Sequence, residues 1–239
     1  MTKLNKDTEF TYLGHSTFRI KSPGGKSIII DPWVKGNPAC PENLKEIDSL
    51  DIMALTHAHF DHISDAVPLG QQHSPKVVGI FETCVWLENR GIKNVLSMNK
   101  GGTQEVDGIK FTMVHADHSC GILEEDGTIS YGGEAVGYII EFENGFRIYH
   151  TGDTAVFSDM KLISEIYKPE LVLMPIGDLY TMSPLEASYA CRFLNVKKVI
   201  PMHYGTFPAL TGTPAKLREL TKDIQGLEIL DIKPGETLS

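Results

Sequence analysis

The sequence has no long apolar run, no cluster of basic residues and no closely spaced pair of cysteines. No stretch of about 18 uninterrupted apolar residues occurs, so we expect no transmembrane helix. Residues 1–9 are polar and lack the apolar centre of a secretory signal, which predicts a cytoplasmic protein with no membrane partner. The four cysteines are far apart and form no C-x-x-C motif, a pattern typical of reduced thiols in an intracellular protein.

An excess of acidic residues argues against binding of nucleic acid. The formal net charge is −9, from 22 Lys and Arg against 31 Asp and Glu. Nucleic acids are held largely by Lys and Arg contacts to phosphate, so we expect a small-molecule substrate and no nucleic-acid partner. The sequence also lacks a Walker-type phosphate loop and a G-x-S-x-G elbow, so neither phosphate-loop nor serine-nucleophile chemistry is predicted.

The pattern of apolar residues indicates a mixed α/β protein with one domain over residues 1–239. The first third contains short β-rich runs at 10–13, 17–21 and 27–31, with the turn Ser22-Pro23-Gly24-Gly25 predicting a hairpin. Strands and helices then alternate. Further strands are expected over 51–56, 77–80, 109–115, 137–142, 146–150, 171–174, 198–202 and 227–232, and helices over about 82–90 and 156–167 and from Ser183 and Thr213 onward.

Four of the predicted strands lead directly into residues that are able to bind a metal ion. These residues are His57, His118, Asp153 and His203. Side chains at strand ends stand on rigid supports while the neighbouring loops leave one face open. We therefore predict a site at the ends of these strands.

The segment Thr56-His57-Ala58-His59-Phe60-Asp61-His62 is the most informative motif in the chain. It places three of the nine histidines and one aspartate within six positions after an apolar strand. Imidazole and carboxylate ligands suit zinc, iron or manganese. His57 and His59 are two residues apart and project to the same side of an extended backbone, while Asp61 and His62 follow in the next turn and are able to reach a second ion.

This motif resembles the signature of the metallo-β-lactamase superfamily. The resemblance implies a four-layer αββα sandwich with a dinuclear metal site along the open edge of its two sheets. Further segments resemble the uncharacterised metal-dependent hydrolase branch, which is similar to the ascorbate-6-phosphate lactonases. These segments are Leu13-Gly14-His15-Ser16, Ile30-Asp31-Pro32, Phe157-Ser158-Asp159-Met160-Lys161, His150-Thr151-Gly152-Asp153-Thr154, Pro201-Met202-His203-Tyr204 and Lys233-Pro234-Gly235-Glu236.

The resemblance also implies a set of metal ligands. The first ion would be held by His57, His59 and His118, the second by Asp61, His62 and His203, with Asp153 bridging both. His115 is an alternative to His118, which we favour because ligands usually lie on the loop after a strand. We expect two divalent metal ions, with Zn²⁺ as the first choice and Mn²⁺ or Fe²⁺ as alternatives.

Other polar residues are candidates for supporting roles. His15 would lie beside the metals and contact substrate, with a structural turn histidine as the alternative. Asp31 and His150 are candidates for orienting the ligand imidazoles. Tyr204 is a candidate donor to a developing oxyanion or, alternatively, a packed tyrosine. Cys120 is expected to be a small packed residue and not a ligand.

The predicted function is hydrolysis of a small ester, lactone or phosphodiester by a hydroxide shared between two metal ions, with Asp61 and Asp153 orienting it. One alternative is a nucleic-acid-processing metallo-hydrolase, which the acidic charge disfavours. Another is a non-catalytic, metal-stabilised binding module. Flavodiiron-type relatives usually carry Glu where this chain has His59, so the resemblance favours a hydrolytic site. It also implies a homo-oligomer.

Overall fold

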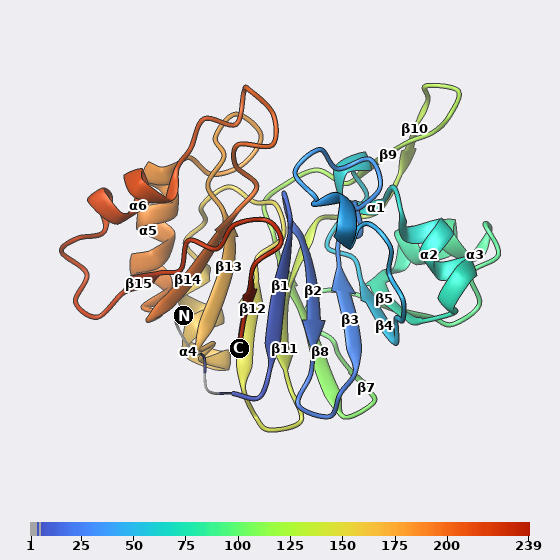
Figure 1. The fold of residues 1–239 in the computed structure, drawn as a ribbon, viewed down its shortest axis with the longest axis horizontal. Coiled ribbons are helices and arrows are strands. Elements are labelled where there is room, and N and C mark those ends of the chain that lie inside the picture. Colours follow the sequence, from blue (N-terminus) through green and yellow to red (C-terminus); the bar gives the residue numbers. More distant parts are fainter. Residues whose placement is uncertain (1–3, 5) are drawn as a thin grey trace.

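The computed structural model describes Leu4 and residues 6–239, so residues 1–3 and 5 of the domain expected over 1–239 lie outside the described part. Two seven-stranded sheets form the centre of the protein (Figure 1). The order in the first sheet is β16 (Thr237–Leu238), β1 (Glu9–Gly14), β2 (Thr17–Lys21), β3 (Ser27–Ile30), β4 (Ile52–Ala54), β5 (Lys76–Ile80) and β6 (Val95–Met98). Its pairs are antiparallel from β16 to β3 and parallel from β3 to β6.

The second sheet repeats this mixture of parallel and antiparallel pairs. Its order is β15 (Glu228–Ile229), β14 (Lys198–Met202), β13 (Leu171–Pro175), β12 (Arg147–His150), β11 (Val136–Glu141), β8 (Ile109–His115) and β7 (Thr103–Val106). The pairs from β15 to β12 are parallel and those from β12 to β7 are antiparallel. A separate two-stranded hairpin, β9 (Gly121–Leu123) and β10 (Ile129–Tyr131), projects from the molecule (Figure 1).

Helices cover the outer faces of both sheets. One group belongs to the first half of the chain, namely α1 (Phe60–Ile63), α2 (Ala66–His73) and α3 (Phe81–Glu88), with a short 3-10 turn, η1 (Glu42–Leu44). The other group is α4 (Met160–Tyr167), α5 (Pro184–Leu194) and α6 (Pro214–Leu220). None of the helices in the described part of the chain has the length and apolar character needed to cross a membrane.

Three apolar clusters hold these layers together. The largest joins the inner faces of the two sheets and includes Phe10, Phe18, Phe111 and Tyr138. A second lies between the first sheet and α2 and α3, and a third lies between the second sheet and the helices α4, α5 and α6. Helix, sheet, sheet and helix therefore form four layers, which confirms the predicted αββα sandwich.

Local sequence signals account for most element boundaries. The Ser183 hydroxyl accepts from the Glu186 backbone N–H while Glu186 reaches back to the Ser183 N–H, which confirms the predicted capping box of α5. The helix expected from about 156 begins only at Met160, and the last predicted strand is reduced to Glu228–Ile229. Helices α1 and α2 and the β9–β10 hairpin were not predicted.

The carboxyl ends of β3, β4, β12, β13 and β14 meet at one edge of the sandwich. Parallel pairing fixes this, because β3 runs beside β4 and β12, β13 and β14 run side by side in one direction. The loops that follow these strands gather along the upper edge in Figure 1. Residues from both halves of the chain are thereby brought together.

Tyr138 joins the two sheets beneath this edge. Its buried hydroxyl, on β11 of the second sheet, donates to the carbonyl of Leu55, which follows β4 of the first sheet, at 2.9 Å.

Tyr138→Phe leaves that buried carbonyl without this donor, so we expect the free energy of unfolding to fall by about 1–2 kcal/mol. Urea unfolding measures the change, with the exposed Tyr131→Phe as a control that should behave like the parent protein; equal stabilities for both variants would contradict the assignment.

Candidate metal centre

The motif residues change from extended to helical backbone within a few positions. His57 and His59 lie on the extended segment after β4, and His59 is the N-terminal flanking residue of α1. Asp61 and His62 lie in the single turn of α1. This change of direction points the two pairs of side chains at neighbouring positions along the edge of the sandwich.

The first group of converging side chains consists of His57, His59 and His118. His57 Nε2 lies 3.1 Å from His59 Nδ1, and His118 Nε2 lies 3.3 Å from the same atom. One ligand atom from each residue falls within 4.8 Å of the others, as a shared ion requires. Burial is the main cause that lowers the pKa of all three imidazoles, which favours neutral nitrogen donors.

The second group consists of His15, Asp61, His62 and His203, again with ligand atoms within 4.8 Å of one another. His203 has a φ of 55° and donates its backbone N–H to the His15 carbonyl at 2.7 Å. Gly177 lies directly against His203, since a Cβ atom at Gly177 would be 1.9 Å from the His203 carbonyl oxygen. The position of His203 therefore depends on glycine at 177.

Asp153 lies between the two groups, on the loop after β12. Its Oδ2 atom is 3.2 Å from His62 Nε2 and 2.9 Å from His203 Nε2, on the side of the second group. The same oxygen is 3.9 Å from His57 Nε2 and 4.0 Å from His118 Nε2, on the side of the first. One carboxylate oxygen thus faces imidazoles of both groups.

Asp31 fixes the orientation of His62. The buried Asp31 carboxylate accepts hydrogen bonds from the backbone N–H and hydroxyl of Thr56 and lies 2.9 Å from His62 Nδ1. With the Nδ1 proton donated to Asp31, His62 Nε2 turns toward Asp153. Burial opposes charge on His62, but the carboxylates of Asp153 and Asp31 outweigh it and raise the pKa of His62 well above its usual value. A positive charge is therefore favoured at the His62 ring.

His15 holds Asp61 in a similar way. His15 Nε2 is 2.9 Å from Asp61 Oδ2 and His15 Nδ1 is 3.1 Å from the Thr206 hydroxyl. Burial is the largest cause that lowers the pKa of His15 to about 4, so the neutral ring donates from Nε2 to the carboxylate and accepts at Nδ1. Burial would raise the pKa of Asp61, but the hydrogen bond from His15 and the charge of His62 lower it to about 2.

The remaining sequence candidates lie outside the two groups. His115 is exposed, and the centroid of its ring lies 4.9 Å from that of Phe157. His150 Nδ1 accepts a hydrogen bond from the backbone N–H of Gly152, beside Asp153. Tyr204 donates to Asp231 and packs against the cluster beneath α5 and α6. Cys120 is buried and its thiol faces the Gly132 carbonyl at 3.2 Å.

Three hydroxyl residues at the centre were not predicted. Thr56 contacts both Asp31 and His57, and its position directly before the motif was an available signal. Ser119 Oγ lies 3.2 Å from His59 Nε2, beside the candidate His118. Thr206 reaches His15 across 191 positions of the chain, and no local pattern announces such a contact.

The donor set fits a divalent metal ion. Asp153 Oδ1 is buried without a hydrogen-bond partner, and the buried His62 Nε2 and His203 Nε2 lie close to Asp153 Oδ2 without hydrogen-bonding geometry, an arrangement that costs free energy in an isolated protein. Imidazole nitrogens and carboxylate oxygens at such separations are the ligands that zinc and related ions prefer. The two groups therefore have the chemistry of metal sites.

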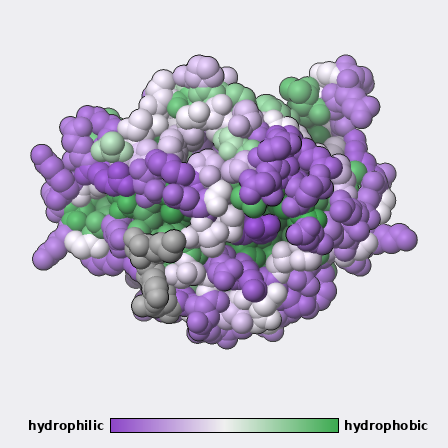
Figure 2. All heavy atoms as spheres, in the orientation of Figure 1, coloured by the Kyte–Doolittle hydropathy of each residue, from purple (hydrophilic) through white to green (hydrophobic). Residues whose placement is uncertain are grey.

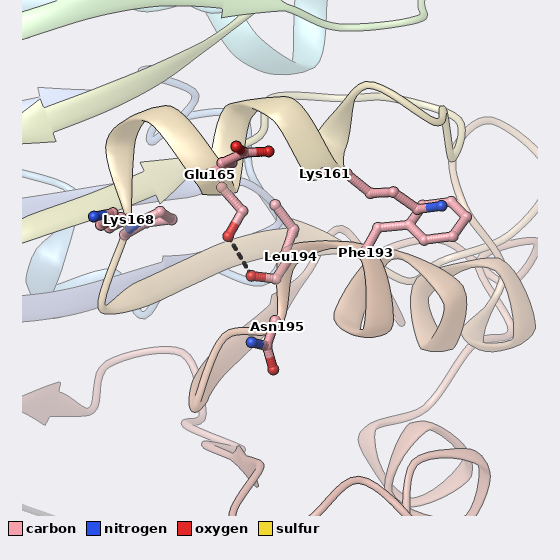
Figure 3. A pocket seen from close by; sticks show the side chains of 8 residues that line it. Lys161, Glu165, Lys168, Phe193, Leu194 and Asn195 are labelled. Carbon is pink, nitrogen blue, oxygen red and sulfur yellow. Dashed lines mark hydrogen bonds between the residues drawn. The ribbon is translucent and has the colours of Figure 1, made fainter.

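A hollow elsewhere on the surface lacks these features. It lies between α4 and the end of α5, where Lys161 stands over the Phe193 ring and Ser164 donates to the Leu194 carbonyl (Figure 3). None of its lining residues belongs to the His and Asp groups found in the described part of the chain.

Comparison with known proteins agrees with the fold. The sequence profile of the family described as "Beta-lactamase superfamily domain" matches residues 9–203, which include every residue of both groups. The chain therefore belongs to the metallo-β-lactamase superfamily.

Similar proteins define the branch more narrowly. The chain is 54% identical over 231 residues to a UPF0173 metal-dependent hydrolase of Koribacter versatilis, covering 97% of each chain. It is 54% identical over 228 residues to one of Solibacter usitatus, covering 95% of this chain and 98% of that protein. The structure of Igni18, described as a novel metallo hydrolase from Ignicoccus hospitalis, superposes with a TM-score of 0.85 at 33% identity over 97% of each chain. The protein is a member of the UPF0173 family.

The arrangement predicts different effects for two nearby histidines. His118→Ala removes an imidazole of the first group, so we expect the metal-loaded protein to lose about one ion per chain, as measured by elemental analysis after dialysis. His115→Ala is the matched control and should keep its full metal content. Loss of metal from His115→Ala, with His118→Ala unaffected, would reverse the assignment.

Asp31 supplies a second prediction. Asp31→Asn keeps the size of the side chain but weakens its hold on His62 and Thr56, so we expect zinc affinity to fall about 10–100-fold. Competition with a chromophoric chelator measures the affinity, and the exposed Asp48→Asn serves as control. An affinity for Asp31→Asn equal to that of the control would show that Asp31 does not orient the site.

Proposed function

We propose that the protein hydrolyses a small ester, lactone or phosphodiester with two divalent metal ions, Zn²⁺ in the first instance. The observation that carries this proposal is the position of Asp153 Oδ2 within 4.0 Å of imidazole nitrogens from both groups. His57, His59 and His118 would hold one ion, and Asp61, His62 and His203 the other, with Asp153 shared. Bound ions supply a Lewis acid and a water molecule that is acidic near neutral pH.

The chain's own residues would prepare the site for this reaction. Asp61 is held at Oδ2 by His15 and keeps a low pKa, so it remains an anionic hydrogen-bond acceptor at neutral pH. His15 is in turn fixed by Thr206 and by its edge contact with Trp33, with ring centroids 5.1 Å apart. The His15–Asp61 pair would therefore orient a nucleophilic water and the oxygen of a bound substrate.

The choice among metals follows from the ligand types. Zn²⁺ binds imidazole and carboxylate with little geometric preference, whereas Mn²⁺ and Fe²⁺ accept the same donors more weakly. Reconstitution with each ion in turn would identify the one that supports turnover. The net charge of −9 makes a nucleic-acid substrate the weaker alternative.

The key test is Asp61→Ala in zinc- and manganese-reconstituted protein. We expect it to lose the ion of the second group and, because metal activation of water commonly lowers the barrier by several kcal/mol, to lose at least about 100-fold in hydrolysis rate. The assay uses a paired panel of small lactones and phosphodiesters, with metal content measured on the same samples. Asp117→Ala is the matched control, because Asp117 is exposed beside the centre and belongs to neither group.

Two results would overturn the proposal. Full activity in protein stripped of metal would exclude a metal-dependent reaction. Retention of two ions with no turnover of any substrate in the panel would favour a metal-stabilised binding module instead.

A further inference from the structure

The β9–β10 hairpin has one face packed on the protein and one face open to solvent. Ile122 points inward and is 2% exposed. Side chains alternate along each strand, so Leu123, Ile129 and Tyr131 share the opposite face, where Ile129 pairs with Leu123 and Tyr131 with Gly121. These three side chains are 59%, 75% and 72% exposed, respectively. We call them the hairpin face.

Three large apolar side chains on one small hairpin are unusual for a solvent-facing surface. Single exposed apolar residues are ordinary, whereas a group of them marks a binding site. In Figure 2 apolar side chains lie on the projecting hairpin beneath its polar tip. The tip contains Glu124, Glu125 and Asp126, so the apolar residues stand between this acidic turn and the metal centre.

A hollow of about 470 Å³ connects the hairpin face with the metal centre. Its lining includes His118 and Ser119 of the metal centre as well as Ile129 and Tyr131 of the hairpin face. Gly121 keeps this passage open, because a Cβ atom there would lie 2.9 Å from Ile129 Cγ2. A molecule whose reacting group sits at His118 would therefore lay its remaining part on Ile129 and Tyr131.

The hollow has no cationic side chain to receive an anion. Among the described residues that line it there is no Lys or Arg, and its one carboxylate, Glu134, is paired with Lys100 outside the lining. Proteins usually hold phosphate and carboxylate groups with Arg, Lys or helix N-termini. The chemistry of the hollow suits an uncharged, apolar group.

We propose that the hairpin face binds the apolar arm of an uncharged ester or lactone while its carbonyl is held at the metal centre. This inference rests on the proposed function and narrows its substrate class, away from phosphodiesters. Ile129 and Tyr131 determine specificity and take no part in bond cleavage. The reaction adds water across the acyl C–O bond, giving a carboxylic acid and an alcohol from an ester or a single hydroxy acid from a lactone.

The test compares 4-nitrophenyl hexanoate, 4-nitrophenyl acetate and bis(4-nitrophenyl) phosphate as substrates of the metal-loaded protein. Four additional methylene groups lying on an open face should raise kcat/KM for the hexanoate over the acetate about tenfold, less than full burial would give. Ile129→Ser and Tyr131→Ser should each reduce this ratio about threefold, with metal content unchanged. Leu162→Ser, on α4 and 54% exposed, is the control and should keep the ratio.

A binding measurement separates this inference from the proposed function. Hydroxamates bind divalent metals but are not esters and are not hydrolysed as such. The difference in affinity between hexanohydroxamate and acetohydroxamate, measured by calorimetry, therefore reports the contribution of the apolar chain. We expect about tenfold tighter binding of the longer compound, and loss of that preference in Tyr131→Ser.

The possible outcomes are distinct. Absence of ester and diester hydrolysis with a retained hydroxamate preference would reject the proposed function and support the apolar subsite. If the hexanoate and acetate esters are hydrolysed at equal rates and the two hydroxamates bind with equal affinity, the proposed function is supported and the apolar subsite is overturned. Preferential hydrolysis of the phosphodiester would have the same two consequences. If Ile129→Ser or Tyr131→Ser converts an oligomer to a smaller species and leaves the chain-length ratio unchanged, the hairpin face is a subunit contact and the inference is wrong.

Discussion

The buried carboxylate of Asp31 is the interaction on which the rest of the centre depends. It accepts from the Thr56 backbone N–H and hydroxyl and pairs with His62 Nδ1, so one side chain ties β3, the end of β4 and α1 together. A charge excluded from water is tolerated only when several donors or a cation surround it. That requirement fixes the start of the histidine motif and turns His62 Nε2 toward Asp153.

The centre also depends on the contact between the two sheets. The first group takes His57 and His59 from the first sheet and His118 from the loop after β8 of the second. The second group joins His15, Asp61 and His62 to His203, which follows β14. Neither group exists within one sheet, so the apolar cluster between the sheets and the Tyr138 hydrogen bond to Leu55 support the chemistry as well as the fold.

Sequence reasoning succeeded where the signal was local. Strand ends before His57, Asp153 and His203 were placed within a few residues, because apolar runs bounded by polar turns define strands. The capping box at Ser183 was found for the same reason. The single turn of α1 escaped prediction, since four residues are too few to show a helical period. The hairpin face was also missed, because its apolar residues are separated by an acidic turn.

The sequence by itself determined the kinds of donor atoms and, through the resemblance of its histidine motif, indicated the superfamily and the αββα architecture that this resemblance implies, because a short motif is defined by residue type and spacing alone. Only the tertiary structure decided how those donors meet: that His118 faces His59 while His115 faces Phe157, and that Thr206 supports His15. It also decided that a cation-free hollow leads from His118 to Tyr131. The physical reason is that such contacts join residues far apart in the chain, and only the pairing of strands and the packing of the two sheets fix their distances.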